Sequence, residues 1–400
     1  MTTHPSAKRE TARSFLQTRL DQALAGDLED LAARGRLRDA RPVRTGPDAR
    51  SRSFVTNDYL GFGAEEFAAD GELAREARWG ARAARLLGGD ADAHSALEEA
   101  LSAWLDRPSS LVFTSGYAAN VGALSALAGP LDFVASDALN HASIIDGLRL
   151  GGAKKAIFPH NDLDALATAL ASETAQKARR RWIAVESYYS MDADIPDLKA
   201  LSALAEAHDA LLYVDEAHAL GVFGAEGRGL CAAAGVVPAV LVGTFGKSLG
   251  TQGAFVTGSE TLRTYLWNRA RSFVFSTGAS PAVAAVTTDR VAAVRLADDR
   301  RDALAGAVSH LRDGLAKLGL PALGVGPIVP VVLGSEARAL FFAGALRKKG
   351  FEVFAVRPPT VAPGTSRLRL TVSARHTRGA IDALLAAIQE TLAEDRCTTD

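Results

Sequence analysis

Short apolar runs alternate with longer amphipathic stretches through the middle of the chain, from about residue 59 to residue 290. Continuous apolar runs are typical of strands buried on both faces, and the amphipathic stretches between them are typical of helices. The pattern therefore predicts a mostly parallel sheet that is covered by helices on both faces. The predicted strands are residues 111–114, 133–136, 156–158, 182–186, 211–215, 240–244, 254–257 and 273–276.

The two ends of the chain follow other patterns. Leucines at positions 16, 20, 24, 28 and 31 predict an amphipathic helix over about residues 7–37, and a polar connection follows at 39–52. After residue 291 the pattern predicts helices at 302–318 and 336–349, strands at 328–333, 353–356 and 368–372, and a final helix. We therefore expect an α/β fold with an N-terminal helix and arm (1–56), a large domain (57–290) and a smaller α+β domain (291–400). Within the large domain, residues 163–171 are predicted to form a helix, with Asn161 as its cap.

Composition and charge exclude several classes of protein. The 400 residues carry 45 basic and 46 acidic side chains, so no strongly basic field exists to attract nucleic acid or an anionic membrane. No apolar run reaches the roughly 18 residues that a membrane span needs. The N-terminal sequence lacks the apolar stretch of a signal peptide. Two cysteines, Cys231 and Cys397, provide neither a disulfide framework nor a metal cluster, and we expect a cytoplasmic protein without a metal.

The candidate chemistry lies where the predicted strands end, which is where open α/β sheets bind ligands. Thr114, Ser115, Gly116 and Tyr117 end one strand and open a helix, whose free amides could bind a phosphate. His141 follows another strand and could stack on a flat cofactor ring. Each feature alone has an ordinary explanation, since such turns are common and a single histidine more often caps a helix or packs in a core.

Two further strand ends carry charged groups. Asp215 ends one strand and could keep a pyridinium nitrogen protonated, with His218 three residues later. Thr244 ends the next strand and precedes Lys247, which burial could turn into a nucleophile and a base. Most lysines are solvated surface charges, and a carboxylate at a strand end usually caps a turn. Together with the phosphate turn and His141, however, the combination favours an enzyme that holds pyridoxal 5′-phosphate (PLP) on Lys247.

These residues lie in stretches that resemble the α-oxoamine synthases, a family within the fold-type I PLP enzymes. The resemblance covers the chain from about residue 20 to residue 392. The stretches that carry it are NDYLGFG (57–63), HSALEEALSAWL (94–105), FTSGYAAN (113–120), LNHASIIDG (139–147), ESYYSMDAD (186–194), VDEAHALGVFGAEGRG (214–229), TFGKSLGTQGAF (244–255), FSTG (275–278) and RPPTVAPGTSRLRL (357–370).

The resemblance implies roles for the residues around the cofactor. Lys247 would hold the cofactor as a Schiff base and later remove the α-proton of the substrate. Asp215 would pair with the pyridine nitrogen, and His218 would bind the ring hydroxyl. The other cofactor contacts that the resemblance implies are His141 on the ring face, Ser190 at its edge, Gly116, Tyr117 and Thr244 at ring and phosphate, and Ser276 and Thr277 from a neighbouring subunit. A homodimer is therefore expected.

The resemblance also implies residues that bind the two small-molecule substrates. Asn57 and Arg369 would hold the carboxylate of an amino acid, and Thr360 would contact an acyl thioester. Arg357 precedes Thr360 in a run that is most similar to family members that join alanine to a pimeloyl thioester in biotin biosynthesis. Arg38 would also contact substrate.

One segment departs from the pattern of the family and leaves other functions open. Residues 80–94 read GARAARLLGGDADAH, and Arg82 and Ala83 replace glycine or small residues near the acyl substrate. The added cation would favour an acidic acyl tail. The alternatives are an α-oxoamine synthase that uses another thioester or amino acid (glycine or serine), an aminotransferase, and a catalytically silent subunit with the same fold.

Overall fold

The computed structural model describes residues 15–34, 52–65 and 78–399. The chain forms two units, residues 1–47 and residues 48–400. In the first unit, helix α1 (Phe15–Ala33) confirms the predicted N-terminal helix for the described part, and Arg34 forms an ion pair with Asp30 one turn before it. The remaining residues of that prediction, together with Arg38, lie outside the described residues.

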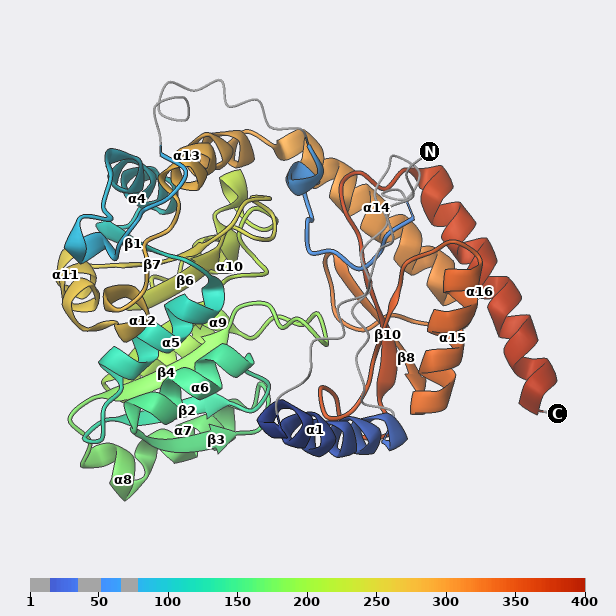
Figure 1. The fold of residues 1–400 in the computed structure, drawn as a ribbon, viewed down its shortest axis with the longest axis horizontal. Helices are drawn as coiled ribbons and strands as arrows, with labels where there is room; N and C mark the ends of the chain where they lie inside the picture. Colours follow the sequence, from blue (N-terminus) through green and yellow to red (C-terminus); the bar gives the residue numbers. More distant parts are fainter. Residues whose placement is uncertain (1–14, 35–51, 66–77, 400) are drawn as a thin grey trace. The chain divides into compact units, whose positions relative to one another are not determined.

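A seven-stranded sheet forms the centre of the second unit (Figure 1). Its order is β1-β7-β6-β5-β4-β2-β3, in which β7 is antiparallel to both neighbours and all other pairs are parallel. The strands are β1 (Ser109–Phe113), β2 (Phe133–Asp137), β3 (Lys154–Phe158), β4 (Arg181–Glu186), β5 (Ala210–Asp215), β6 (Val240–Thr244) and β7 (Ala254–Gly258). The mostly parallel sheet confirms the α/β fold class.

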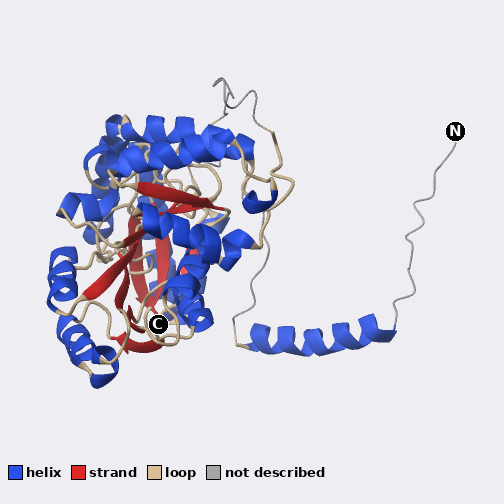
Figure 2. Cartoon of the chain, turned by 90° about the vertical axis from the view of Figure 1, so that its left-hand side faces the viewer, coloured by secondary structure: helices blue, strands red, loops and turns tan. Residues whose placement is uncertain are grey.

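Helices cover both faces of this sheet and enclose its inner strands (Figure 2). Successive side chains of a strand enter opposite cores: Leu212 and Val214 of β5 join one hydrophobic cluster, whereas Tyr213 joins the other. The first cluster is completed by α4 (Asp92–Leu105), α7 (Leu163–Ala171), α8 (Glu173–Gln176), α9 (Leu198–Ala207), α10 (Gly229–Ala234) and α13 (Pro281–Arg295). The second is completed by α5 (Gly116–Leu127), α6 (Ala142–Gly151), α11 (Glu260–Arg269) and α12 (Arg271–Val274).

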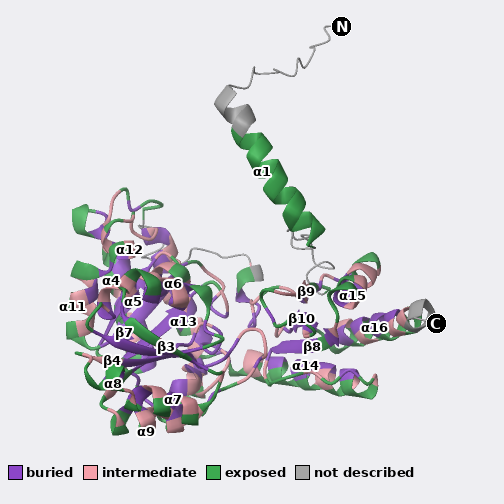
Figure 3. Ribbon diagram, turned by 90° about the horizontal axis from the view of Figure 1, so that it is seen from below, coloured by how far each residue is buried: buried purple, intermediate pink, exposed green. Residues whose placement is uncertain are grey.

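A smaller antiparallel sheet follows, in the order β8-β10-β9. Its strands are β8 (Ile328–Gly334), β9 (Phe354–Val356) and β10 (Ser366–Thr371), and the helices of this region are α14 (Asp298–Lys317), α15 (Glu336–Lys348) and α16 (Arg378–Thr399). Strand β10 is the central one and is buried along its whole length, like β1, β2 and β7 of the large sheet, whereas the edge strand β3 is mostly exposed (Figure 3). These elements confirm the pattern predicted after residue 291. The domain boundary predicted at residue 290 falls within α13, and the three-domain division stays a prediction.

Two local predictions were wrong. Residues 273–276, predicted as a strand, lie in α12 and the turn after it, because Phe273 packs against Phe113 and Trp267 in the core beneath the helix rather than extending the sheet. The cap of α7 is Asp162 and not Asn161: the Asp162 side chain accepts a hydrogen bond from Ala165 N at 2.9 Å. A run of apolar and aromatic residues fits a short strand and a buried helical turn equally well.

Among the helices of the described ranges, none is long and apolar enough to cross a membrane.

Candidate active site

The predicted catalytic side chains follow the carboxyl ends of neighbouring parallel strands. Asp215 ends β5, Lys247 follows β6, and His141 follows β2 as the N-cap of α6. Because β2, β4, β5 and β6 run in the same direction, these ends meet at one edge of the sheet. The charges of Lys247 and Asp215 act on His141, and those of Lys247 and His141 act on His218. The structure therefore brings these four predicted residues together.

Asp215 is buried and is held by two hydrogen bonds. Its Oδ1 accepts from Ala217 N at 2.8 Å, and its Oδ2 accepts from Asn120 Nδ2 at 2.7 Å. Donors on both oxygens fix the plane of this carboxyl group. A carboxylate held in this way can pair with a protonated ring nitrogen.

Asn120, on α5, connects Asp215 to His141 through a buried network. Its Oδ1 accepts from the hydroxyl of Tyr213 at 2.7 Å, and its Nδ2 also donates to Ser143 Oγ at 2.9 Å. Ser143 Oγ lies 2.7 Å from His141 Nδ1. The amide of Asn120 and the hydroxyls of Tyr213 and Ser143 all have partners in this network. The network therefore holds Asp215 and His141 in one arrangement.

Lys247 lies among groups that change its protonation. Burial lowers its pKa to about 8, although the negative charges of Asp215 and Glu186 oppose this shift. Burial also raises the pKa of Glu186 to about 8, and the charge of Asp215 adds to the effect. Glu186 ends β4 opposite Asp215, and its Oε1 accepts a hydrogen bond from His141 N at 2.6 Å. An amine with a pKa of about 8 is partly uncharged near neutral pH and can act as nucleophile or base.

The predicted phosphate turn opens α5. Ser115 is its N-cap and accepts a hydrogen bond from Ala118 N at 3.1 Å. The amides of Gly116 and Tyr117 belong to the first turn, where a helix leaves its donors without intrahelical partners. A Cβ on Gly116 would lie 3.7 Å from Thr244, which is ordinary contact distance. The turn and Thr244 therefore face one another and can bind an anion.

Tyr117 contributes its amide to this turn, whereas its side chain points elsewhere. Its hydroxyl donates to Asp146 Oδ2 at 2.5 Å on α6, and the side chain is about half exposed. The ring of Tyr117 is thus tied to the helix that His141 caps.

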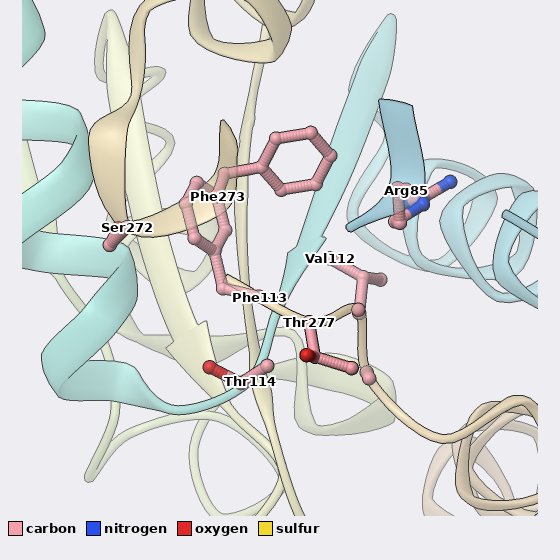
Figure 4. A pocket seen from close by; sticks show the side chains of 9 residues that line it. Arg85, Val112, Phe113, Thr114, Ser272, Phe273 and Thr277 are labelled. Carbon is pink, nitrogen blue, oxygen red and sulfur yellow. The ribbon is translucent and has the colours of Figure 1, made fainter. Parts of the chain in front are cut away.

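A small pocket adjoins the end of β1. Thr114 and Thr277 lie next to each other at one end of it, with Arg85 and Phe273 among the other lining residues (Figure 4). Ser276 precedes Thr277 and directs its hydroxyl to the Thr277 carbonyl at 3.4 Å. The contribution of Ser276 and Thr277 from a neighbouring subunit stays a prediction.

The second side of the site comes from strand β10. Arg369 is buried and donates through Nη2 to Asn57 Oδ1 at 3.1 Å, through Nε to Ser190 O at 2.7 Å, and through Nη1 to Thr371 Oγ1 at 3.1 Å. The structure thus joins the two predicted carboxylate-binding residues, and the charge of Arg369 reaches Lys247 and His218. Ser190 contributes its backbone carbonyl to this cluster.

The predicted acyl-binding residues lie on the loop between β9 and β10. Thr360 is exposed, and its amide donates to the Arg357 carbonyl at 3.1 Å. Within the described part of the chain, no hydrogen bond joins Thr360 to the cluster around Lys247, so the roles of Arg357 and Thr360 stay predictions.

Several residues of the site were missed by sequence reasoning. Asn120, Ser143, Glu186 and Tyr59 were included in matching stretches but received no role. Tyr59 is fully buried, and its hydroxyl lies 2.6 Å from His218 Nδ1. The signal that could have found them is their position: Glu186 ends a strand, as Asp215 does, and Tyr59 lies two residues after Asn57.

Taken together, the residues fit PLP. The helix N-terminus with Thr244 suits its phosphate, Asp215 suits its ring nitrogen, and Lys247 has the lowered pKa that imine formation requires. A Cβ added to Gly246 would lie 3.7 Å from Thr251 O, which is ordinary contact distance. The backbone beside Lys247 therefore leaves space for a cofactor.

The chain is similar to known proteins along most of its length. The model of the family aminotransferase class I and II matches residues 53–388. An 8-amino-7-oxononanoate synthase of Anaeromyxobacter dehalogenans is 44% identical over 92% of this chain and 95% of its own length. The enzyme of the same name from Methylococcus capsulatus is 43% identical over 93% of this chain and 98% of its own. A serine palmitoyltransferase of Sphingomonas wittichii has a TM-score of 0.85 at 30% identity and covers 94% of this chain and 98% of its own. A solved structure of an enzyme abbreviated SPT contains PLP and also has a TM-score of 0.85.

Proposed function

We propose that this chain joins L-alanine to a pimeloyl thioester. The chain belongs to the class I and II aminotransferase family and, within it, to the α-oxoamine synthases. The products would be 8-amino-7-oxononanoate, CO2 and the free thiol of coenzyme A or of a carrier protein, in biotin biosynthesis. The observation that carries this proposal is the 44% identity to an enzyme of that name over 92% of the chain.

The residues of the site can perform each part of this reaction. PLP, when bound, supplies an electron sink for the negative charge that develops at the α-carbon of the amino acid. Lys247 would take the proton from that carbon, and its pKa of about 8 suits a base near neutral pH. Arg369 and Asn57 would hold the carboxylate of alanine and so fix which bond of the α-carbon faces Lys247.

The bond changes balance with alanine and the thioester alone. A carbon–carbon bond forms between the α-carbon and the thioester carbonyl, the carbon–sulfur bond breaks, and the thiol leaves with a proton. The bond from the α-carbon to the carboxylate then breaks and releases CO2, and a proton takes its place. Lys247 lies next to Asp215 and Glu186 and would return this proton.

A homodimer in the cytoplasm is part of the proposal. Phe275, just before Ser276 and Thr277, is exposed, and so is Leu87. The segments that carry these two side chains are joined by a hydrogen bond from Gly278 N to Ala83 O at 3.0 Å. Exposed apolar side chains on two segments that a backbone hydrogen bond joins favour a surface that another subunit covers.

A different acyl donor is the second candidate, because Arg82 replaces a glycine or small residue near the acyl substrate. Arg82 is exposed and has φ of +66°, a conformation that glycine adopts readily and that costs other residues about 1 kcal/mol. An arginine at such a position places a positive charge on the loop that the family resemblance assigns to the acyl substrate.

The test is a thiol-release assay on purified, PLP-loaded protein. Alanine, glycine and serine are crossed with pimeloyl-, acetyl-, succinyl- and palmitoyl-CoA, and products are identified by mass. We expect release with alanine plus pimeloyl-CoA, and Lys247→Ala should abolish both release and the absorbance above about 400 nm. Release with another pair only, or turnover of a keto acid, would overturn the proposed substrates.

A variant separates the two acyl candidates. Arg82→Gly removes the charge and suits the observed backbone. If Arg82 binds an acidic tail, the variant should lose several-fold more kcat/KM with pimeloyl-CoA than with an uncharged acyl chain. Equal losses would count against that contact.

A further inference from the structure

His218 contacts Tyr59 and feels the charges of Lys247 and Arg369. Tyr59 and His218 are both buried, and their rings are tilted by 50° with centroids 6.2 Å apart. The Tyr59 hydroxyl lies 2.6 Å from His218 Nδ1. The contact joins residues 159 positions apart, so it is a product of the fold.

The protonation of both groups follows from their surroundings. Burial lowers the pKa of His218 well below 6.5, and the charges of Lys247 and Arg369 add to this effect. Burial raises the pKa of the Tyr59 hydroxyl above its ordinary value, although Arg369 opposes the shift. Near neutral pH, therefore, His218 is an uncharged imidazole with one donor and one acceptor nitrogen, and Tyr59 keeps its proton.

The neighbours of Tyr59 decide the direction of the hydrogen bond. The positive charge of Arg369 acts on the Tyr59 hydroxyl, and because a guanidinium can only donate, Arg369 cannot take the hydroxyl proton. The hydroxyl proton then has two possible acceptors, His218 Nδ1 at 2.6 Å and Asn57 Oδ1 at 3.3 Å. Asn57 Oδ1 already accepts from Arg369 Nη2 at 3.1 Å, so the shorter contact to His218 is the better acceptor.

We propose that Tyr59 is a positioning residue that holds His218 in the tautomer with its proton on Nε2. In this tautomer Nδ1 accepts from Tyr59, and Nε2 is the donor that remains for the site. The inference rests on the proposed function in one respect, namely that His218 faces the ring oxygen of PLP. It adds that His218 can donate to this oxygen only because Tyr59 occupies the other nitrogen.

The same hydroxyl links the two sides of the site. Arg369 and Asn57 form the predicted carboxylate clamp, and His218 belongs to the cofactor side. The Tyr59 hydroxyl contacts Asn57 and His218, and the charge of Arg369 acts on it. The opposite arrangement, in which His218 Nδ1 donates to Tyr59 and Tyr59 donates to Asn57, would leave Nε2 as an acceptor and is the alternative that an experiment must separate.

The first measurement is made on the wild-type apoprotein and needs no substrate. Protein labelled with nitrogen-15 at histidine is examined near pH 7.5 by two-bond nitrogen–proton correlation NMR, which distinguishes the protonated nitrogen of a neutral ring. The signals of His218 are identified by their loss in His218→Gln. We expect the proton on Nε2, and a proton on Nδ1 would overturn the inference without any variant.

The second measurement uses Tyr59→Phe, with Tyr188→Phe as the matched control. Tyr188 is also a buried tyrosine, but its hydroxyl donates to Val325 O at 2.5 Å, on the loop before β8. In Tyr59→Phe we expect both tautomers of His218, and in Tyr188→Phe the Nε2 tautomer alone. In the PLP-loaded variant the pH midpoint of the absorbance above 400 nm should rise by roughly half a unit or more, since the ring oxygen loses its donor.

The outcomes separate this inference from the proposed function. An unchanged tautomer and an unchanged midpoint in Tyr59→Phe would overturn the role of Tyr59, whatever the substrates are. A wild type with the Nε2 tautomer but no thiol release from alanine and pimeloyl-CoA would overturn the proposed substrates and leave the role of Tyr59 intact.

Discussion

The side of the site that carries Lys247 and Asp215 is held within one sheet, whereas the side that carries Arg369 is held between elements of two sheets. On the first side, Asn120 bonds to Tyr213, Ser143 and Asp215, all of them on the seven-stranded sheet or the helices that cover it. On the second side, Arg369 comes from the three-stranded sheet and bonds to Asn57 and to the carbonyl of Ser190.

The loop of residues 187–195 makes the second side possible. It leaves β4 of the large sheet and is bound from the small sheet by Arg369 at Ser190 O and by Arg367 at Met191 O, 3.0 Å away. From the large sheet, His160 bonds to Asp194 of the same loop at 2.6 Å. Groups for the cofactor are therefore positioned locally, while groups for the amino acid depend on contacts across two sheets. Substitutions on the two sides should therefore have separable effects.

The largest effect is expected for Arg369→Lys. A lysine has one ammonium group and cannot keep the contacts to Asn57 and Ser190 while also binding a carboxylate with two parallel bonds. The KM for the amino acid should rise roughly 100-fold, with the absorbance of bound PLP little changed. Steady-state kinetics and spectra of the loaded enzyme measure the two effects.

Arg367→Lys is the control for this prediction, because Arg367 lies on the same strand but binds Asp192 and Met191 O. It should raise KM much less. If Arg369→Lys loses PLP as readily as it loses the amino acid, the two sides are not separable.

A smaller effect, on the opposite side, is expected for Asn120→Ala. The change leaves Tyr213 Oη and one oxygen of Asp215 without their present partner, which costs about 1–3 kcal/mol when such groups stay buried. The Kd for PLP should rise roughly tenfold, and the KM for the amino acid should change less. Titration of apoprotein with PLP, together with urea unfolding, tests both.

Asn140→Ala is the matched control. Asn140 is also buried and donates to Ser136 Oγ at 2.9 Å and to Ala184 O at 2.7 Å, without contact to Asp215. It should lower the free energy of unfolding by a similar amount and leave the Kd for PLP nearer to wild type. Equal losses of PLP affinity would mean that Asn120 acts through general stability.

The same contrast explains how much could be predicted from the sequence. Strand ends are visible as apolar runs that stop at a polar residue, so Asp215 and Lys247 could be predicted together at one sheet edge. Asn120 is a single polar residue within helix α5, and its partner Tyr213 is 93 positions away. No local pattern in the sequence therefore shows their hydrogen bond. For Asn57 and Arg369, 312 positions apart, only the family resemblance suggested a pair.

Local errors have the same physical origin. The strand predicted at 273–276 was wrong because burial of Phe273 is decided by Phe113 and Trp267, which belong to other elements. The tautomer of His218 likewise depends on Tyr59, which no spacing along the chain connects to it.

The smallest effect is expected where the two sides are joined, at His160. Burial opposes its protonation, but hydrogen bonds to Asp137 at 2.9 Å and to Asp194 at 2.6 Å outweigh this and raise its pKa to about 10, from an ordinary 6.5. Between these values the folded protein keeps a proton that the unfolded chain has lost. The contribution of His160 to the free energy of unfolding is therefore complete below pH 6.5 and is lost as the pH rises through 10.

His160→Gln should lower the free energy of unfolding by about 1–2 kcal/mol at pH 6 and by less at pH 9. Urea unfolding of both proteins at the two pH values measures this, and a difference that grows with pH would contradict the charged bridge between the large sheet and the loop of residues 187–195.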